Sequence, residues 1–348
     1  MTARPSVATQ LLYAALSTGV AIGVSEGVVR VADQGALPQL DCYADTPAAG
    51  AAGATILLVP GCARVLILPN GGVWTAETDG DGLRRLPDGP PGAPWLVVGD
   101  SHVFGMNAEG GETFVAGLRA AGVPARPVGV AGHGVADALD HARRLRDGAR
   151  GVLVLVNGAN DWAEEGLPVR ERYRVEGGWL LSPDAAARFP GRFFASPLAR
   201  SHLLTYSMVL GAHDWGEDIA EGRWRSSPWG LAPDERAAAT ASIARDIRAF
   251  ALENPDIPTR VAILPVDFAL TEARARAVLP TARLDAAPWA VPGPWSDLRA
   301  ALADVPTLEL TPFFRDPTDF LEGDFHLSRA GHAKMTRALL EWLPAPSE

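Results

Sequence analysis

The stretch that decides the fold class is WLVVGDSHVFG, residues 95–105. Four apolar residues, two of them β-branched, run into a Gly-Asp-Ser turn, and an amphipathic segment follows at 113–118. This order predicts a buried strand that ends in a tight turn before a helix. Open α/β sheets bind their ligands at such carboxyl strand ends. A serine there, Ser101, can be a nucleophile if a base and an anion-stabilising pocket meet it. The plain alternative is that Asp100 or Ser101 only caps the helix.

Further apolar runs typical of strands recur along the chain, with helical patterns between or after them. Strands are expected at 95–98, 127–130, 151–156, 260–266 and 307–310. Helices are expected at 112–121, 135–147, 234–253, 268–278 and 328–342. This alternation predicts an α/β fold with a parallel five-stranded sheet covered on both faces, a three-layer α/β/α sandwich.

A long insertion, about 162–233, separates the third and fourth expected strands. It is too long for a plain loop, so it should carry helices of its own and form the substrate-side wall. Its tryptophans either stack sugars or simply pack the insertion onto the core; they are Trp179, Trp215, Trp224 and Trp229.

The N-terminus is a candidate signal or anchor. Residues 7–24 carry no charge, and these 18 residues reach the lower limit for crossing a bilayer, although polar residues and glycines dilute them. We expect an N-terminal hydrophobic helix over 1–32 that is an export signal or a membrane anchor. The alternative is a helix packed against a soluble domain.

Residues 33–94 differ in character from the rest. The β-prone runs at 55–59 and 63–68, separated by Pro60-Gly61, predict a small antiparallel β unit with tight turns. The Pro- and Gly-rich run at 88–92 predicts a linker. The main domain is then expected to cover 95–343.

Composition narrows the classes of partner. The net charge of −10 argues against nucleic acid, since no basic run exists to neutralise phosphates. Seven histidines and two cysteines show no zinc-binding spacing, so we expect no metal and no cofactor. Cys42 and Cys62 would close a loop worth about 3 kcal/mol in an oxidising compartment, and would remain thiols in the cytosol.

Three more motifs follow expected strands, at the same sheet edge as Ser101. GVAGHG at 129–134 contains Gly132, whose backbone N–H can approach a substrate closely. NGAND at 157–161 contains Asn160, whose amide could enter the same space. GDFHLS at 323–328 contains His326, a candidate general base. Each has a plain alternative as a turn, cap or loop residue, but their common placement favours one site.

These four blocks resemble those of the SGNH hydrolases, the GDSL-type esterases and lipases. The resemblance covers about 95–343 without the insertion. It implies a flavodoxin-like fold and a serine esterase that forms an acyl-serine intermediate. In it Ser101 attacks an ester, His326 moves the proton and Asp324 orients the imidazole. The backbone N–H groups of Ser101 and Gly132 and the side chain of Asn160 would form the oxyanion hole.

One departure concerns the acid. The family usually places it three residues before the histidine, a position that Gly323 occupies here. Asp324 is only two residues before, so Glu322 or a backbone carbonyl could serve instead. His102 and His133 are expected to be partly exposed loop residues, with a place in the pocket lining as the alternative, and His332 is expected to be structural.

Two other functions use the same residues or scaffold. An O-acyltransferase would pass the acyl group to a carbohydrate, and a non-catalytic relative would only bind carbohydrate. The substrate is expected to be a small-molecule or carbohydrate ester, with acyl length and alcohol left open. The location is expected to be extracytoplasmic (periplasmic or secreted), with membrane anchoring through residues 7–24 as one form of it. A cytoplasmic location is the alternative, and the oligomeric state is left open.

Overall fold

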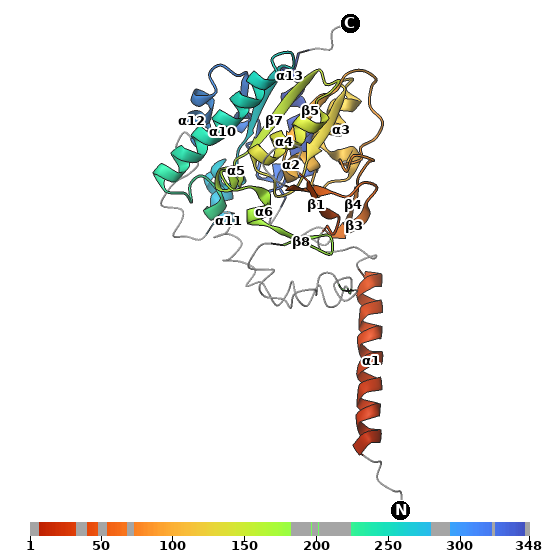
Figure 1. Cartoon of the computed structure of the whole chain (residues 1–348). Coiled ribbons are helices and arrows are strands. Elements are labelled where there is room, and N and C mark those ends of the chain that lie inside the picture. Colours follow the sequence, from red (N-terminus) through yellow and green to blue (C-terminus); the bar gives the residue numbers. More distant parts are fainter. Residues whose placement is uncertain are drawn as a thin grey trace, which may run out of the picture.

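The computed structural model describes residues 7–32, 40–47, 54–67, 73–181, 196, 201, 224–279, 293–321 and 324–344. A five-stranded parallel sheet forms its centre (Figure 1). Its strands are β5 (Trp95–Gly99), β6 (Ala125–Gly129), β7 (Gly151–Asn157), β10 (Thr259–Leu264) and β11 (Thr307–Glu309). Each lies at or within two residues of an expected strand.

The sheet order is β11-β10-β7-β5-β6. If the five strands of this sheet are numbered 1 to 5 in chain order, the order from the β6 edge is 2-1-3-4-5. This is the flavodoxin-like order. β5 therefore lies between β6 and β7, with Val98 in register with Val128 and Val154. The direction of chain winding reverses at β5 and β7, so their carboxyl ends border the crevice in which such sheets bind ligands.

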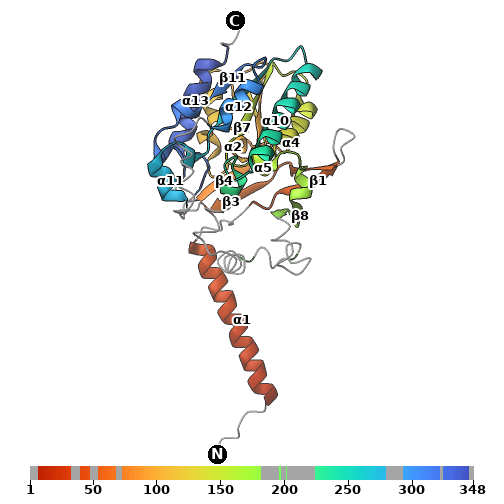
Figure 2. The same ribbon diagram turned by 90° about the vertical axis from the view of Figure 1, so that its left-hand side faces the viewer.

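Helices cover both faces of the sheet because its strands are apolar on both sides. Val152, Val154 and Val156 pack in one hydrophobic cluster, and Leu153 and Leu155 pack in the other. The first face carries α4 (Val135–Leu145), α10 (Pro233–Glu253) and α12 (Pro294–Ala301). The second carries α3 (Phe114–Ala120) and α13 (Arg329–Trp342). Figure 2 shows α10 and α13 on opposite sides of the strands. The predicted three-layer α/β/α sandwich is confirmed.

The segment before the sandwich forms two short antiparallel pairs. β1 (Tyr43–Pro47) pairs with β2 (Ala54–Leu58), and β3 (Ala63–Ile67) pairs with β4 (Val73–Glu77). β2 and β3 are the two runs expected from sequence, but each pairs with a strand that the pattern did not indicate rather than across Pro60-Gly61. Cys42 and Cys62 are joined as a disulfide.

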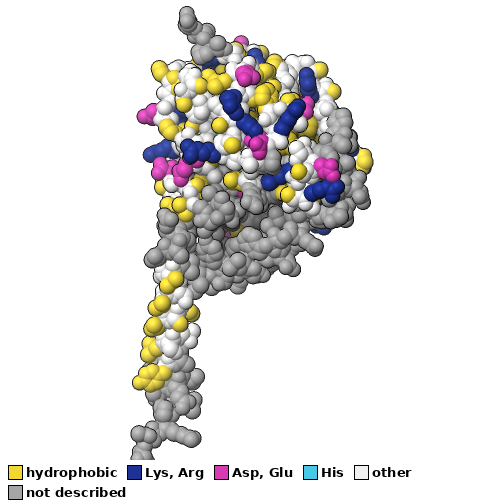
Figure 3. Space-filling view, turned by 180° about the vertical axis from the view of Figure 1, so that it is seen from behind, with side chains coloured by type: hydrophobic (Ala, Val, Ile, Leu, Met, Phe, Trp, Pro, Cys, Tyr) yellow, Lys and Arg dark blue, Asp and Glu magenta, His cyan; other side chains and the backbone are white. Residues whose placement is uncertain are grey.

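The N-terminal helix α1 (Val7–Ala32) extends away from the sandwich (Figures 1 and 2). Large apolar side chains are exposed along it (Figure 3): Tyr13, Leu16, Val20, Ile22, Val24 and Val28. Among the described residues, no helix combines the length and the apolar character needed to cross a membrane.

Candidate active site

Ser101 stands at the first position of a short helix that starts where β5 ends. This helix, α2 (Ser101–Phe104), is capped by Asp100, whose Oδ1 accepts a hydrogen bond from the His102 backbone N–H at 2.9 Å. α2 can lie this close to β6 because residue 129 is glycine. A Cβ there would come within 2.3 Å of the Phe104 nitrogen. The helix-cap alternative thus describes Asp100, while Ser101 faces a cavity.

A chain of hydrogen bonds links Ser101 to the loop before α13. His326 Nε2 lies 2.8 Å from Ser101 Oγ, and His326 Nδ1 lies 2.8 Å from Asp324 Oδ1. Asn107 Nδ2 donates to the other oxygen of Asp324 at 2.5 Å. A carboxylate on Nδ1 places the second nitrogen toward the hydroxyl as a proton acceptor, the arrangement that activates a serine.

Asn160 is held by a second network behind the serine turn. Asn157 Nδ2 donates to Asn160 Oδ1 at 2.7 Å and to Asp100 Oδ2 at 2.8 Å. Because Oδ1 of Asn160 is engaged in this way, its NH₂ group is the part that remains to donate elsewhere. Asn160 also occupies the N-cap position of α5 (Asp161–Glu164), three residues after the end of β7, and its side chain makes no cap hydrogen bond.

The cavity beside Ser101 has a volume of about 450 Å³, a size suited to a small ligand. Ser101, Gly132, Asn160, Asp324 and His326 all line it. The structure thus brings together every site residue expected from sequence. Gly132 has φ of +84°, in the left-handed region that favours glycine, and an added Cβ would come within 3.1 Å of Leu180.

Residues that the motifs did not identify complete the cavity. Leu40 and Tyr43 come from the N-terminal segment, far from the expected domain. Residues of the insertion also line it, namely Glu164, Tyr173, Leu180 and Ser226. Neither Asn107 nor the pair Leu40 and Tyr43 belongs to a motif, so only the folded chain reveals them.

Glu164, in the cavity wall, has a carboxyl group with a shifted pKa. Burial raises its pKa to about 7, while Arg172 and a hydrogen bond from the Asn160 side chain act in the opposite direction. Arg172 lies 3.1 Å from Glu164 Oε1 and 2.9 Å from Asp137 Oδ2. Glu164 therefore connects the Asn160 amide to a half-buried ion-pair network.

The prediction that His102 and His133 are partly exposed loop residues is wrong. Both are buried. Burial lowers the pKa of His102 to about 4 and also lowers that of His133. Neither lines the cavity, although the His102 ring lies 5.0 Å from that of His326. The third, His332, is structural as expected: its Nδ1 accepts the Phe114 backbone N–H at 3.3 Å.

The tryptophans of the insertion that can be described do not line the cavity. Trp179 is buried, and Trp224 and Trp229 pack against Phe268. These three follow the packing alternative. Trp215 lies outside the described residues, as do Gly323 and Glu322.

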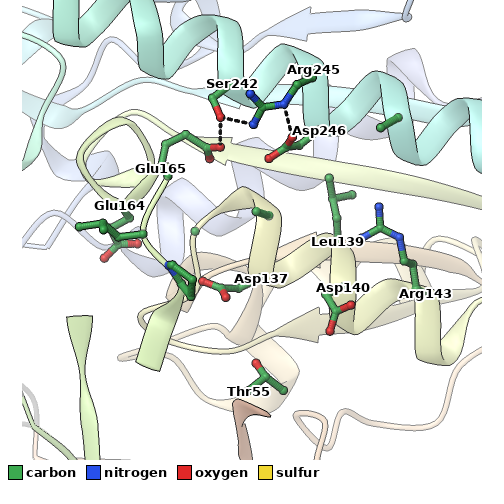
Figure 4. A pocket seen from close by; sticks show the side chains of 16 residues that line it. Thr55, Asp137, Leu139, Asp140, Arg143, Glu164, Glu165, Ser242, Arg245 and Asp246 are labelled. Atoms are coloured by element: carbon green, nitrogen blue, oxygen red, sulfur yellow. Dashed lines mark hydrogen bonds and ion pairs between the residues drawn. The ribbon is translucent and has the colours of Figure 1, made fainter. Parts of the chain in front are cut away.

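A second cavity of about 430 Å³ lies between α4 and α10 (Figure 4). Ser242 donates to Glu165 at 2.8 Å and receives a bond from Arg245 at 2.6 Å, so it links these two charged side chains. Glu164 borders both cavities. In the described part of the chain, no group of three or more His, Cys, Asp or Glu residues is suited to a metal ion.

Comparison with known proteins gives distant structural matches. No family model and no curated protein matches the chain. A protein assigned to the G-D-S-L lipolytic family from Desulfitobacterium hafniense DCB-2 matches 72% of this chain and 99% of its own, with 12% identity and a TM-score of 0.37. A GDSL-like lipase from Bacteroides thetaiotaomicron VPI-5482 matches 71% and 86%, with 12% identity and a TM-score of 0.33.

A third match is a carbohydrate esterase family 2 enzyme with a carbohydrate-binding domain, from Corynascus thermopiles (Myceliophthora fergusii). It matches 87% of both chains, with 12% identity and a TM-score of 0.37. The sequence blocks of this chain meet at the switch point of a flavodoxin-like sheet, around a serine bonded to a histidine. In these blocks and in this fold the chain resembles the SGNH hydrolases.

Proposed function

We propose that the protein is a serine ester hydrolase that works through an acyl-serine intermediate. The observation that carries the proposal is the hydrogen-bond chain from Ser101 through His326 to Asp324, with 2.8 Å at each step. Its position on the wall of a 450 Å³ cavity supplies room for an ester.

In the first half-reaction, Ser101 Oγ attacks the ester carbonyl carbon while His326 Nε2 accepts the hydroxyl proton. The C–O bond to the alcohol then breaks, and His326 returns the proton to the leaving alkoxide. In the second half-reaction, His326 removes a proton from water, the hydroxide attacks the acyl-serine, and Ser101 recovers its proton as the acid departs. Asp324 stabilises the imidazolium that forms in both halves.

The negative charge on the carbonyl oxygen requires donors that are already in place. The backbone N–H groups of Ser101 and Gly132 and the NH₂ group of Asn160 fill that role in this proposal. All three residues line the same cavity, and the bond from Asn157 orients the Asn160 amide.

A fluorophosphonate probe tests the nucleophile directly. We expect the wild-type protein to be labelled at Ser101, and the Ser101→Ala variant to be neither labelled nor active on p-nitrophenyl esters. Equal labelling of the variant, or no labelling of wild type, would refute the assignment. Product analysis with and without an added carbohydrate then separates hydrolysis from transfer: free acid as the main product supports a hydrolase, and exclusive acylation of the carbohydrate would overturn it.

A further inference from the structure

The apolar lining of the active-site cavity belongs to two different packed clusters. One wall, here called the histidine wall, packs with the sheet and α12 and consists of Ala159, Val266 and Phe325. The other, the N-terminal wall, packs around the disulfide-linked segment and consists of Leu40, Tyr43, Met106, Ala131, Tyr173 and Leu180. The cavity therefore offers a ligand two separate apolar surfaces.

The histidine wall lies on the side of the leaving alcohol. The ring of Phe325 stacks on that of His326, with 4.5 Å between centroids and 26° between planes. If the function proposed above holds, His326 hands its proton to the alcohol oxygen, so the alcohol must depart beside this ring. The acyl group then extends toward the N-terminal wall.

The N-terminal wall is fixed in place from several directions. The Tyr43 backbone N–H donates to the Gly178 carbonyl at 2.8 Å, which ties β1 to the turn of the insertion hairpin. His133, next to Gly132, bonds through Nε2 to the Ile56 carbonyl at 2.7 Å. The Cys42–Cys62 disulfide closes the segment on itself. Residues 40–47 and 54–62 are therefore coupled to the turn that carries Gly132.

We infer that Leu40 and Tyr43 bind the acyl group, and that the substrate is an ester of an aliphatic acid longer than acetic acid. This inference rests on the proposed function. An acetyl group offers one methyl to a wall of six apolar side chains, whereas each further methylene that becomes buried is worth about fourfold in affinity. Two added methylenes are thus expected to raise kcat/KM by about 15-fold.

The test compares p-nitrophenyl acetate, butyrate and octanoate. We expect the wild-type protein to prefer butyrate to acetate by about 15-fold in kcat/KM. Leu40→Ala deepens the wall and should raise the octanoate-to-butyrate ratio by about tenfold, and Leu40→Phe should lower it. Opposite shifts from two substitutions at one position are not produced by general destabilisation, and either variant alone gives a result if the other does not fold.

Leu58→Ala is the matched control, since Leu58 is buried in the same cluster but does not line the cavity. It should lower stability and leave the chain-length ratios unchanged. The inference is overturned if wild type uses acetate as well as butyrate, or if both Leu40 variants keep the wild-type ratios. Fluorophosphonate labelling is measured in every variant. Labelled proteins with unchanged ratios contradict only this inference, whereas an unlabelled wild type contradicts the proposed function.

Discussion

Substitution of Asn160 is expected to affect the chemical step and not substrate binding. Its NH₂ group is expected to strengthen its hydrogen bond only as the carbonyl oxygen becomes charged. Asn160→Ala should therefore lower kcat by about 10²–10³-fold, or roughly 2.7–4 kcal/mol, with little change in KM. Steady-state kinetics on a p-nitrophenyl ester measures both constants. A rise in KM at constant kcat would show that Asn160 binds the substrate and the transition state equally well.

Asn107 is a positioning residue, because it contacts Asp324 and not the reacting atoms. Its φ of +64° lies in the left-handed region, so Asn107→Gly removes the amide while keeping the backbone conformation. We expect kcat to fall about tenfold, the scale of losing a hydrogen bond to a charged group. Asn107→Asp places a second carboxylate beside Asp324 and should cost more. Equal activity of Asn107→Gly and wild type would show that Asp324 is held without it.

At this scale the sequence could predict the residues that react but not those that hold them. Ser101 and Asn160 follow the buried strands β5 and β7 closely, so their common sheet edge can be derived from strand direction. His326 comes in the loop before α13, well after β11, and its place was expected from its motif. Asn107 lies 217 positions from Asp324, in a turn with no pattern of its own. The burial of His102 was missed because its neighbour Ser101 suggested an open loop. His102 is buried because α2, to which it belongs, packs closely against β6.

Among the elements, the buried strands were the most predictable. β5 and β7 are buried along their whole length, and such continuous apolar runs are typical of parallel strands. The partner strand of β2 was not predictable, because that partner, β1 (YADTP), has no apolar alternation. Helix α12 was missed as well, since eight residues beginning at Pro294 give too short a periodic pattern.

The disulfide gives the N-terminal segment a measurable stability. It joins residues 20 positions apart, and closing such a loop is worth about 3 kcal/mol in the unfolded state. Reduction, or Cys62→Ser, should lower the free energy of unfolding by about this amount. Denaturant titration with and without a phosphine reductant measures it, with the Cys62→Ser variant as the control that reductant should not affect. An unchanged midpoint on reduction would show that the bond adds no stability.

Over the whole molecule, two sets of buried groups oppose each other in their response to pH. Burial lowers the pKa of His332 to about 3, below the value of 6.5 that it has when unfolded. Between these values the unfolded chain binds more protons, so this histidine makes the protein less stable as pH falls. Burial raises the pKa of Glu164 from 4.5 to about 7. Between those values the folded chain binds more protons, so Glu164 makes the protein less stable as pH rises.

Because the two groups respond to pH in opposite ways, substituting each of them should change the slope of unfolding free energy against pH in opposite directions. In the His332→Gln variant the unfolded chain no longer binds a proton at this position, and the glutamine side chain still offers an acceptor for the Phe114 N–H. Between pH 5 and 6 it should lower the slope of unfolding free energy against pH by about 1.4 kcal/mol per unit. Glu164→Gln should raise that slope by a similar amount, since it removes the proton that the folded chain binds. Urea unfolding at several pH values measures each slope. Parallel curves for wild type and both variants would show that these two groups have ordinary pKa values in the folded protein.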